Sequence, residues 1–133
     1  MSRENVELIR RAYDAYSRGD REGFVELMDP DVEFESLILE AEGGAYRGHD
    51  GVREYFDKVH EVFESWRSEI TEIEEIGSDS FVIESRAVAS GKAGQVPVEQ
   101  TFWQAAKRTH EKIVWWKFCR TRAEALEAVG LRE

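Results

Sequence analysis

The residues best suited to proton transfer in this sequence are His49, Glu35 and Glu99. A histidine titrates near neutral pH, so His49 could act as a general acid or base. It stands directly before Asp50, the expected N-cap of a helix, and its ring could equally cover the start of that helix. Glu35 and Glu99 fall in strand-like segments, where each could be an exposed carboxylate on the solvent side. The sequence therefore offers three candidates for acid–base chemistry, each with a structural alternative.

Metal, disulfide and thiol chemistry find little support in the residue types and their spacing. The three histidines, His49, His60 and His110, fall on different expected elements, and no histidine or carboxylate pair has the spacing of metal ligands. Cys119 is the single cysteine, which excludes an internal disulfide, and no histidine stands near it in the sequence to activate its thiol. We therefore expect no metal site and no cofactor.

The strongest helical pattern covers residues 50–66, where apolar side chains recur every three or four positions. That spacing puts one apolar stripe along one side of a helix. A first helix is expected over residues 2–18 and a short second one after Asp20, because Gly19 and Asp20 are typical of a helix end and a helix start. A capping box at residues 121–124 predicts a short C-terminal helix.

Alternating apolar and polar residues predict five strands between and after these helices. The first covers residues 32–37, and the others form a meander over residues 70–76, 81–90, 96–106 and 113–120. Residues 40–48 are polar and contain glycine, so we expect a loop there. Consecutive antiparallel strands with helices on one face give an α+β layer.

The last strand shows which side chains should face inward. Alternation puts Val114, Trp116 and Phe118 on one purely apolar face, which should look into the core. Arg120 follows at the end of that face, where it could bind an anionic ligand. Trp115 lies on the opposite, outer face, where we expect an interface residue rather than a catalytic one.

The composition excludes several classes of protein. At 133 residues the chain is expected to form one domain, residues 1–133, with a sizeable core. The net charge of −10 argues against a nucleic-acid partner. No apolar run approaches the roughly 20 residues that span a membrane, and the start lacks the apolar core of a signal peptide, so we expect a cytoplasmic protein. Four tryptophans require a large apolar interior, a pocket or an interface.

Several sequence blocks resemble the SnoaL-like, polyketide-cyclase-related branch of the nuclear-transport-factor-2-like (NTF2-like) superfamily. These blocks cover residues 15–20, 30–34, 46–53, 111–114 and 122–131. The resemblance implies a cone, in which a strongly bent, mostly antiparallel sheet wraps around the long first and middle helices, with a short C-terminal helix. It also implies a hydrophobic small-molecule pocket in the cone, and commonly a homodimer through the outer sheet face, where Trp115 is expected.

The steroid isomerases of this superfamily allow one chemistry to be tested residue by residue. Alignment of the Gly-Asp pair after the first helix puts Ala12 at their oxyanion-stabilising tyrosine, with Tyr16 one turn later on the same face. Their general-base aspartate falls on Ser36, which cannot do that work at neutral pH. Their second oxyanion donor, a neutral carboxylic acid, falls near Gln104. A ketosteroid-type isomerase is therefore not expected.

Two kinds of function stay open on the sequence. The first is a cofactor-independent cyclase, isomerase or hydrolase acting on a small apolar or carbonyl-bearing compound. In it, His49 or a carboxylate handles protons while Tyr16 and Gln104 donate hydrogen bonds. The second is a non-catalytic binding module, or an accessory dimer, with the same cone. The side chains expected to bind the ligand are Phe34, Ser36, Phe56, Trp116, Phe118 and Arg120, whereas Tyr13, Tyr55 and Trp103 are expected in the core.

Overall fold

The computed structural model describes residues 3–35, 45–91 and 98–130 of the chain. Its elements are α1 (Arg3–Arg18), α2 (Arg21–Glu26), β1 (Met28–Glu35), β2 (Ala45–Arg47), α3 (Gly48–Val62), β3 (Phe63–Ile76), β4 (Ser80–Gly91), β5 (Val98–Thr109), β6 (Lys112–Cys119) and α4 (Arg122–Ala128). None of the helices in these ranges is long and apolar enough to cross a membrane.

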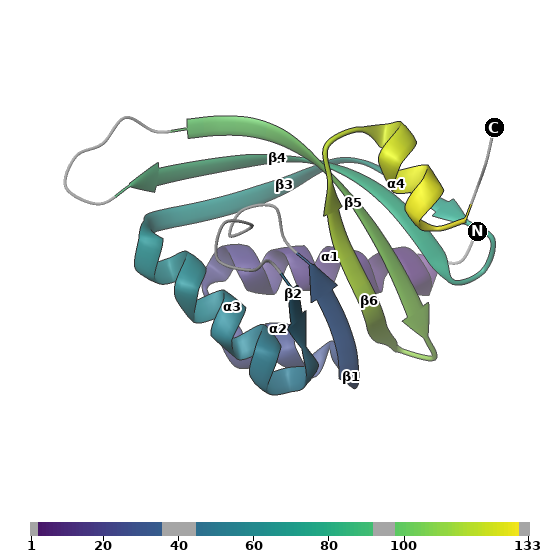
Figure 1. Ribbon diagram of the computed structural model, residues 1–133, viewed down its shortest axis with the longest axis horizontal. Coiled ribbons are helices and arrows are strands. Elements are labelled where there is room, and N and C mark those ends of the chain that lie inside the picture. Colours follow the sequence, from purple (N-terminus) through teal and green to yellow (C-terminus); the bar gives the residue numbers. More distant parts are fainter. Residues whose placement is uncertain (1–2, 36–44, 92–97, 131–133) are drawn as a thin grey trace.

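The six strands form one curved sheet in the order β2-β1-β6-β5-β4-β3. Only the β1–β6 pair is parallel among the described strands, and all the other neighbours are antiparallel. Helices α1, α2 and α3 lie on one side of the bent sheet, and the short α4 lies on the other side (Figure 1). This arrangement confirms the mostly antiparallel α+β cone that the resemblance implied.

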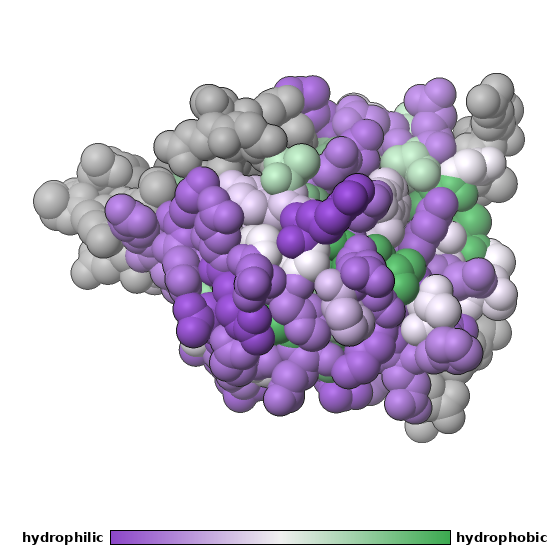
Figure 2. Space-filling model, turned by 60° about the horizontal axis from the view of Figure 1, so that its bottom comes forward, coloured by the Kyte–Doolittle hydropathy of each residue, from purple (hydrophilic) through white to green (hydrophobic). Residues whose placement is uncertain are grey.

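Two hydrophobic clusters lie on opposite faces of this sheet. The main core fills the cone between the three helices and the inner face, with Ile9, Tyr55 and Phe81 fully buried. A smaller cluster lies beneath α4 on the outer face and includes Ala105 and Leu126. Figure 2 brings the lower side of Figure 1 forward and shows mostly hydrophilic side chains there. The interior of the cone is therefore the large apolar environment of the molecule.

The long helix ends at Val62 rather than near Trp66, which corrects the sequence prediction. Phe63 has extended backbone angles and starts β3. Residues three apart normally point to opposite faces of a strand. Here the register shifts just after Phe63, so Phe63 and Trp66 both reach the main core, with ring centroids 5.1 Å apart. A strand with a bulge thus mimics the three-residue spacing of a helix.

The start of this helix also differs from the prediction. Its N-cap is Arg47 rather than Asp50, which lies inside the first turn. Residues 45–47, expected in a loop, form β2 and pair with β1, so that Tyr46 lies opposite Phe34. Gly48 joins this strand to the helix with a φ of +71°, and a Cβ there would lie 3.2 Å from the Pro30 carbonyl oxygen. Glycine makes this abrupt junction possible.

The β5–β6 hairpin extends further than the sequence indicated. Strand β5 continues to Thr109, and the turn falls at His110. The register between the two strands shifts near this turn, so Ile113, not Val114, enters the main core. Beyond the shift, Trp116 and Phe118 face inward as predicted. The predicted positions at residues 2, 36–37 and 96–97 lie outside the described residues.

Candidate functional site

An interior cavity of about 20 Å³ lies between the three helices and the inner face of the sheet. That volume gives room for about one water molecule. The cavity is lined by Ala12, Tyr13, Tyr16, Phe24, Phe34, Tyr55, Ser68, Gln104, Trp116 and Phe118. None of these described lining residues is a carboxylate, a histidine, a lysine or an arginine. The cavity is therefore mostly aromatic, and its polar groups are neutral.

A buried amide forms the polar centre of this cavity. Gln104 projects from the inner face of β5 and is only 2% exposed. Its Oε1 accepts a hydrogen bond from the Tyr13 hydroxyl of α1 and another, at 2.9 Å, from the Ser85 hydroxyl of β4. Both lone pairs of the amide oxygen are thus occupied. These bonds fix the orientation of the Gln104 side chain and tie α1 to the middle of the sheet.

Two further tyrosines join α1 to α3 across the cavity. The Tyr16 hydroxyl donates to the Tyr55 hydroxyl at 3.3 Å, and both side chains are buried. Burial raises the pKa of Tyr16 well above its usual value, and the neighbouring Tyr55 adds to the effect. Burial also raises the pKa of Tyr13. Tyr13 and Tyr16 therefore stay neutral at physiological pH, so they can donate hydrogen bonds but cannot serve as bases.

The apolar walls come from aromatic rings on the sheet. Phe34 of β1 lies parallel to Trp116 of β6, with ring centroids 6.1 Å apart, and its centroid is 4.6 Å from that of Tyr55. Phe118 is only partly buried and contacts the same cluster. The indole Nε1 of Trp116 is buried and has no hydrogen-bond partner in the described part of the chain. One wall thus carries an unsatisfied donor.

Comparison with known proteins identifies the family. Residues 9–116 match the model of the SnoaL-like domain. The chain belongs to the SnoaL-like domain family. A search of curated protein sequences finds no match for this SnoaL-like domain.

Solved structures share the fold of this SnoaL-like domain. An NTF2-like protein of unknown function from Burkholderia pseudomallei is 22% identical with a TM-score of 0.79, and 98% of this chain and 99% of that chain are covered. TerC, co-crystallised with polyporic acid, is 24% identical with a TM-score of 0.78, covering 93% and 96%. A Mycobacterium tuberculosis protein in complex with estradiol-17β-hemisuccinate is 16% identical with a TM-score of 0.74, covering 86% and 92%. At these identities the similarity concerns the fold.

The sequence predicted that His49, Tyr16 and Gln104 would act together on a ligand. The structure of this SnoaL-like domain does not bring all three together. Tyr16 and Gln104 line the cavity, but His49 lies outside its lining, in the first turn of α3. The His49 Nε2 lies 2.8 Å from the Met28 carbonyl oxygen. A carbonyl oxygen only accepts, so Nε2 carries the hydrogen and donates it. This bond ties the helix start to β1, which favours the structural alternative for His49.

The carboxylate candidates also lie outside the cavity. Glu35 is exposed, and its carboxylate lies 4.0 Å from Lys117 on the outer face. Glu99 forms an ion pair with Arg86 at 3.1 Å, again among exposed side chains. Both arrangements agree with the structural alternatives that the sequence left open.

The expected ligand-binding residues divide into three groups. Phe34, Trp116 and Phe118 line the cavity, and their role in ligand binding stays a prediction. Phe56 is buried one layer away, where its ring stacks on His60 at a centroid distance of 4.2 Å, and Arg120 is exposed beyond the end of β6. Ser36 lies outside the described residues.

Sequence reasoning missed the polar role of Tyr13 and Tyr55, which were expected only as core residues. Both are buried, and both also present hydroxyl groups to buried partners at the cavity. The signal in the sequence was the pair of tyrosines three residues apart on the apolar face of α1, since Tyr13 and Tyr16 lie on one side of a helix. A buried tyrosine usually needs a hydrogen-bond partner, which a phenylalanine does not.

The outer face of the sheet is partly covered by α4. Trp115 packs against the cluster beneath that helix, and Lys107 Nζ lies 5.4 Å from its ring centroid. Cys119 belongs to the same cluster, and burial raises the pKa of its thiol to about 11, which makes it a poor nucleophile. The homodimer through this face stays a prediction.

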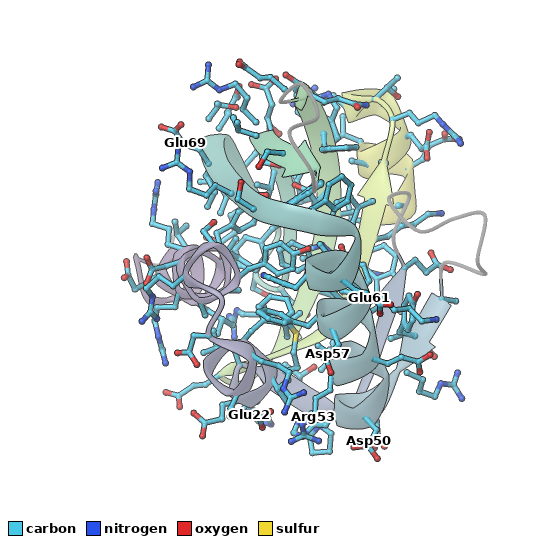
Figure 3. All side chains as sticks on the ribbon, turned by 90° about the vertical axis from the view of Figure 1, so that its left-hand side faces the viewer. Glu22, Asp50, Arg53, Asp57, Glu61 and Glu69 are labelled. Atoms are coloured by element: carbon cyan, nitrogen blue, oxygen red, sulfur yellow. The ribbon has the colours of Figure 1, made fainter. Side chains whose placement is uncertain are left out.

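Charged side chains gather instead on the outside, where α2 meets α3 (Figure 3). Arg53 bonds to Glu22 at 3.0 Å and to Asp50 at 3.0 Å, and Arg21 bonds to Asp57 at 2.9 Å. The hydrogen bond from Arg53 holds the pKa of Glu22 below its usual value. The pairs Arg53–Glu22 and Arg21–Asp57 link α2 to α3 at the surface, and the pair Arg53–Asp50 lies within α3.

Proposed function

We propose that this SnoaL-like domain binds a small, uncharged and largely apolar molecule in its interior cavity, without acid–base catalysis. The observation that carries the proposal is the lining itself, in which aromatic rings surround a few neutral hydrogen-bonding groups. Ligand sites are commonly apolar, with a small number of placed polar groups that fix orientation. The buried Gln104 amide and the Tyr16–Tyr55 hydroxyl pair have this character.

The absence of charge in the described lining argues for a neutral ligand. A carboxylate or ammonium group moved out of water needs an opposite charge or several hydrogen bonds to offset its desolvation. The described lining residues supply no such countercharge. General acid–base catalysis would likewise need an ionisable group beside the ligand, which His49, bonded to Met28, does not provide. Binding is therefore better supported than catalysis.

The size of the cavity limits what it can hold in this conformation. Its volume of about 20 Å³ is far below the roughly 300–1,000 Å³ of sites for drug-sized ligands. A larger ligand requires a wall to move. Phe118 is the natural candidate, because it is only partly buried while Phe34 and Trp116 are almost fully buried. Crystal structures of TerC and of the M. tuberculosis protein, which share the fold, contain small organic molecules, and this supports the binding of a small molecule. The neutral character of the ligand is argued from the lining alone.

A thermal-shift screen tests the proposal. Ketones, lactones, epoxides, hydrocarbons and carboxylic acids of increasing size are added to the wild type and to Ala12→Val, which places two extra methyl groups into the cavity wall. A ligand that binds only the folded state raises the melting temperature. We expect neutral compounds to stabilise the wild type and to stabilise Ala12→Val much less. Each binding compound is then recovered and analysed, because conversion into a product would refute non-catalytic binding.

A further inference from the structure

The indole N–H of Trp116 is buried and has no hydrogen-bond acceptor in the described part of the protein. Trp116 as a whole residue is only 4% exposed. Nearly all buried polar groups in proteins are paired, either with protein atoms or with water. An indole nitrogen can only donate. Whatever satisfies Trp116 must therefore bring a hydrogen-bond acceptor into the interior.

The position of Trp116 points to the cavity as the place where that acceptor sits. Its ring lines the cavity, next to Phe34 and Tyr13. On the sheet, Gln104 lies opposite Phe118 and Trp116 lies opposite Ala106, which makes Gln104 and Trp116 diagonal neighbours on the inner face. Diagonal neighbours are roughly 7–8 Å apart. One small ligand could therefore contact both of these long side chains.

The neighbouring amide strengthens the preference for an acceptor. Both hydrogen bonds that Gln104 makes with described residues use its oxygen. The group that Gln104 could still offer to a ligand is therefore its NH₂ group. This group is also a donor. Tyr13 links the two positions, because its hydroxyl bonds to Gln104 and its ring centroid lies 5.6 Å from that of Trp116. Both donors thus belong to side chains that line the cavity.

We infer that Trp116 Nε1 donates a hydrogen bond to the ligand, and that the cavity selects carbonyl compounds, such as ketones and lactones, over hydrocarbons of the same shape. The inference rests on the proposed function and deepens it by naming a ligand class and a specificity-determining residue. The alternative partner is a buried water, because the cavity has room for about one. The two partners respond differently when a carbonyl compound is added.

The experiment compares cyclohexanone with methylenecyclohexane, which has nearly the same shape but no acceptor. The chain contains four tryptophans, so ¹⁵N-labelled protein gives four indole N–H signals at most. Trp116→Phe assigns one signal by its loss and keeps an aromatic ring in the wall. Trp115→Phe is the matched control, since this neighbouring tryptophan faces the outer cluster. Melting temperatures show that both variants fold.

We expect cyclohexanone to shift the Trp116 indole proton far more than the other three and methylenecyclohexane to leave it nearly unmoved. Trp116→Phe should reduce the preference for the ketone about 3- to 10-fold, as expected for one hydrogen bond. Phenylalanine has a smaller ring than tryptophan and leaves extra space, which affects both probes alike. The ratio of the two affinities is therefore insensitive to that space. Trp115→Phe should keep the wild-type ratio.

Each contrary result has a separate meaning. If both probes bind and the Trp116 signal does not respond to the ketone, water or nothing satisfies the indole, and the inference is wrong while the proposed function stands. An unchanged affinity ratio in Trp116→Phe overturns it in the same way. If neither probe binds, the proposed function fails for ligands of this size, and the inference falls with it.

Discussion

Replacing Gln104 by leucine gives the sharpest test of the buried polar network. Leucine has a similar size and leaves the apolar packing of β5 largely intact, but it removes the acceptor shared by Tyr13 and Ser85. Both of those side chains are buried, with exposures of 8% and 1%. An unsatisfied buried hydroxyl costs ~1–3 kcal/mol. For two hydroxyls we therefore expect Gln104→Leu to lower the free energy of unfolding by ~2–6 kcal/mol, a large part of the ~5–15 kcal/mol typical of a domain.

Urea denaturation, followed by tryptophan fluorescence and circular dichroism, measures this change. The matched control is the triple variant Tyr13→Phe/Ser85→Ala/Gln104→Leu, in which no member of the network is left without a partner. Replacing all partners by apolar groups of similar shape can be nearly neutral. The triple variant should thus be more stable than Gln104→Leu alone, a strong departure from additivity. A loss below ~0.5 kcal/mol in Gln104→Leu, or a triple variant whose loss equals the sum of the single losses, would refute the reasoning.

Three other predictions concern single substitutions. His49→Ala removes the bond to the Met28 carbonyl and should cost ~1 kcal/mol in urea denaturation, while ligand affinity, measured by thermal shift, stays unchanged. Ala12→Val should strongly weaken ligand binding in the same assay and cost ~1–3 kcal/mol of stability, the usual cost of extra methyl groups in a packed core. Arg53 lowers the pKa of Glu22 in the folded state, so the unfolded state takes up this proton first as the pH falls. The stability deficit of Glu22→Gln should therefore be present at pH 7, begin to shrink as the pH falls through about 4.3, the value of an unfolded glutamate, and vanish only below the lower pKa of the folded state. Melting temperatures recorded across that range measure it.

The sequence predicted those elements whose apolar period is regular along the whole segment. Strands β4 and β5 and the helix α1 are of this kind, and the alternation on β6 correctly placed Trp116 and Phe118 inside. It failed where tertiary pairing breaks the period. The bulge after Phe63 gives a strand the spacing of a helix, and the three residues of β2 are a strand only because β1 lies beside them.

The sequence predicted the positions of some candidate site residues but not their hydrogen bonds. The alignment with the steroid isomerases of the superfamily predicted Gln104 and Tyr16 in the same interior, whereas the facing of residues 96–106 stayed open on the sequence. The sequence could not show that His49 would bond to a carbonyl 21 residues away, because that contact depends on how β1 meets α3. The sequence also could not show that Tyr13 donates a buried hydrogen bond in addition to packing in the core. Long-range hydrogen bonds decide these roles, and local pattern carries no information about them.

The polar network has a further consequence for function. If the triple variant at Tyr13, Ser85 and Gln104 proves as stable as the wild type, then the fold does not require a buried amide at the centre of its sheet. The network would then be explained by what it presents to the cavity, namely a Gln104 side chain held in one orientation by two hydroxyl donors. A preorganised donor binds a ligand without a further loss of side-chain entropy. The triple variant should accordingly fold normally and lose affinity for cyclohexanone but keep affinity for methylenecyclohexane, as measured by titration. Equal affinity of the triple variant and the wild type for the ketone would show that the network serves the fold alone.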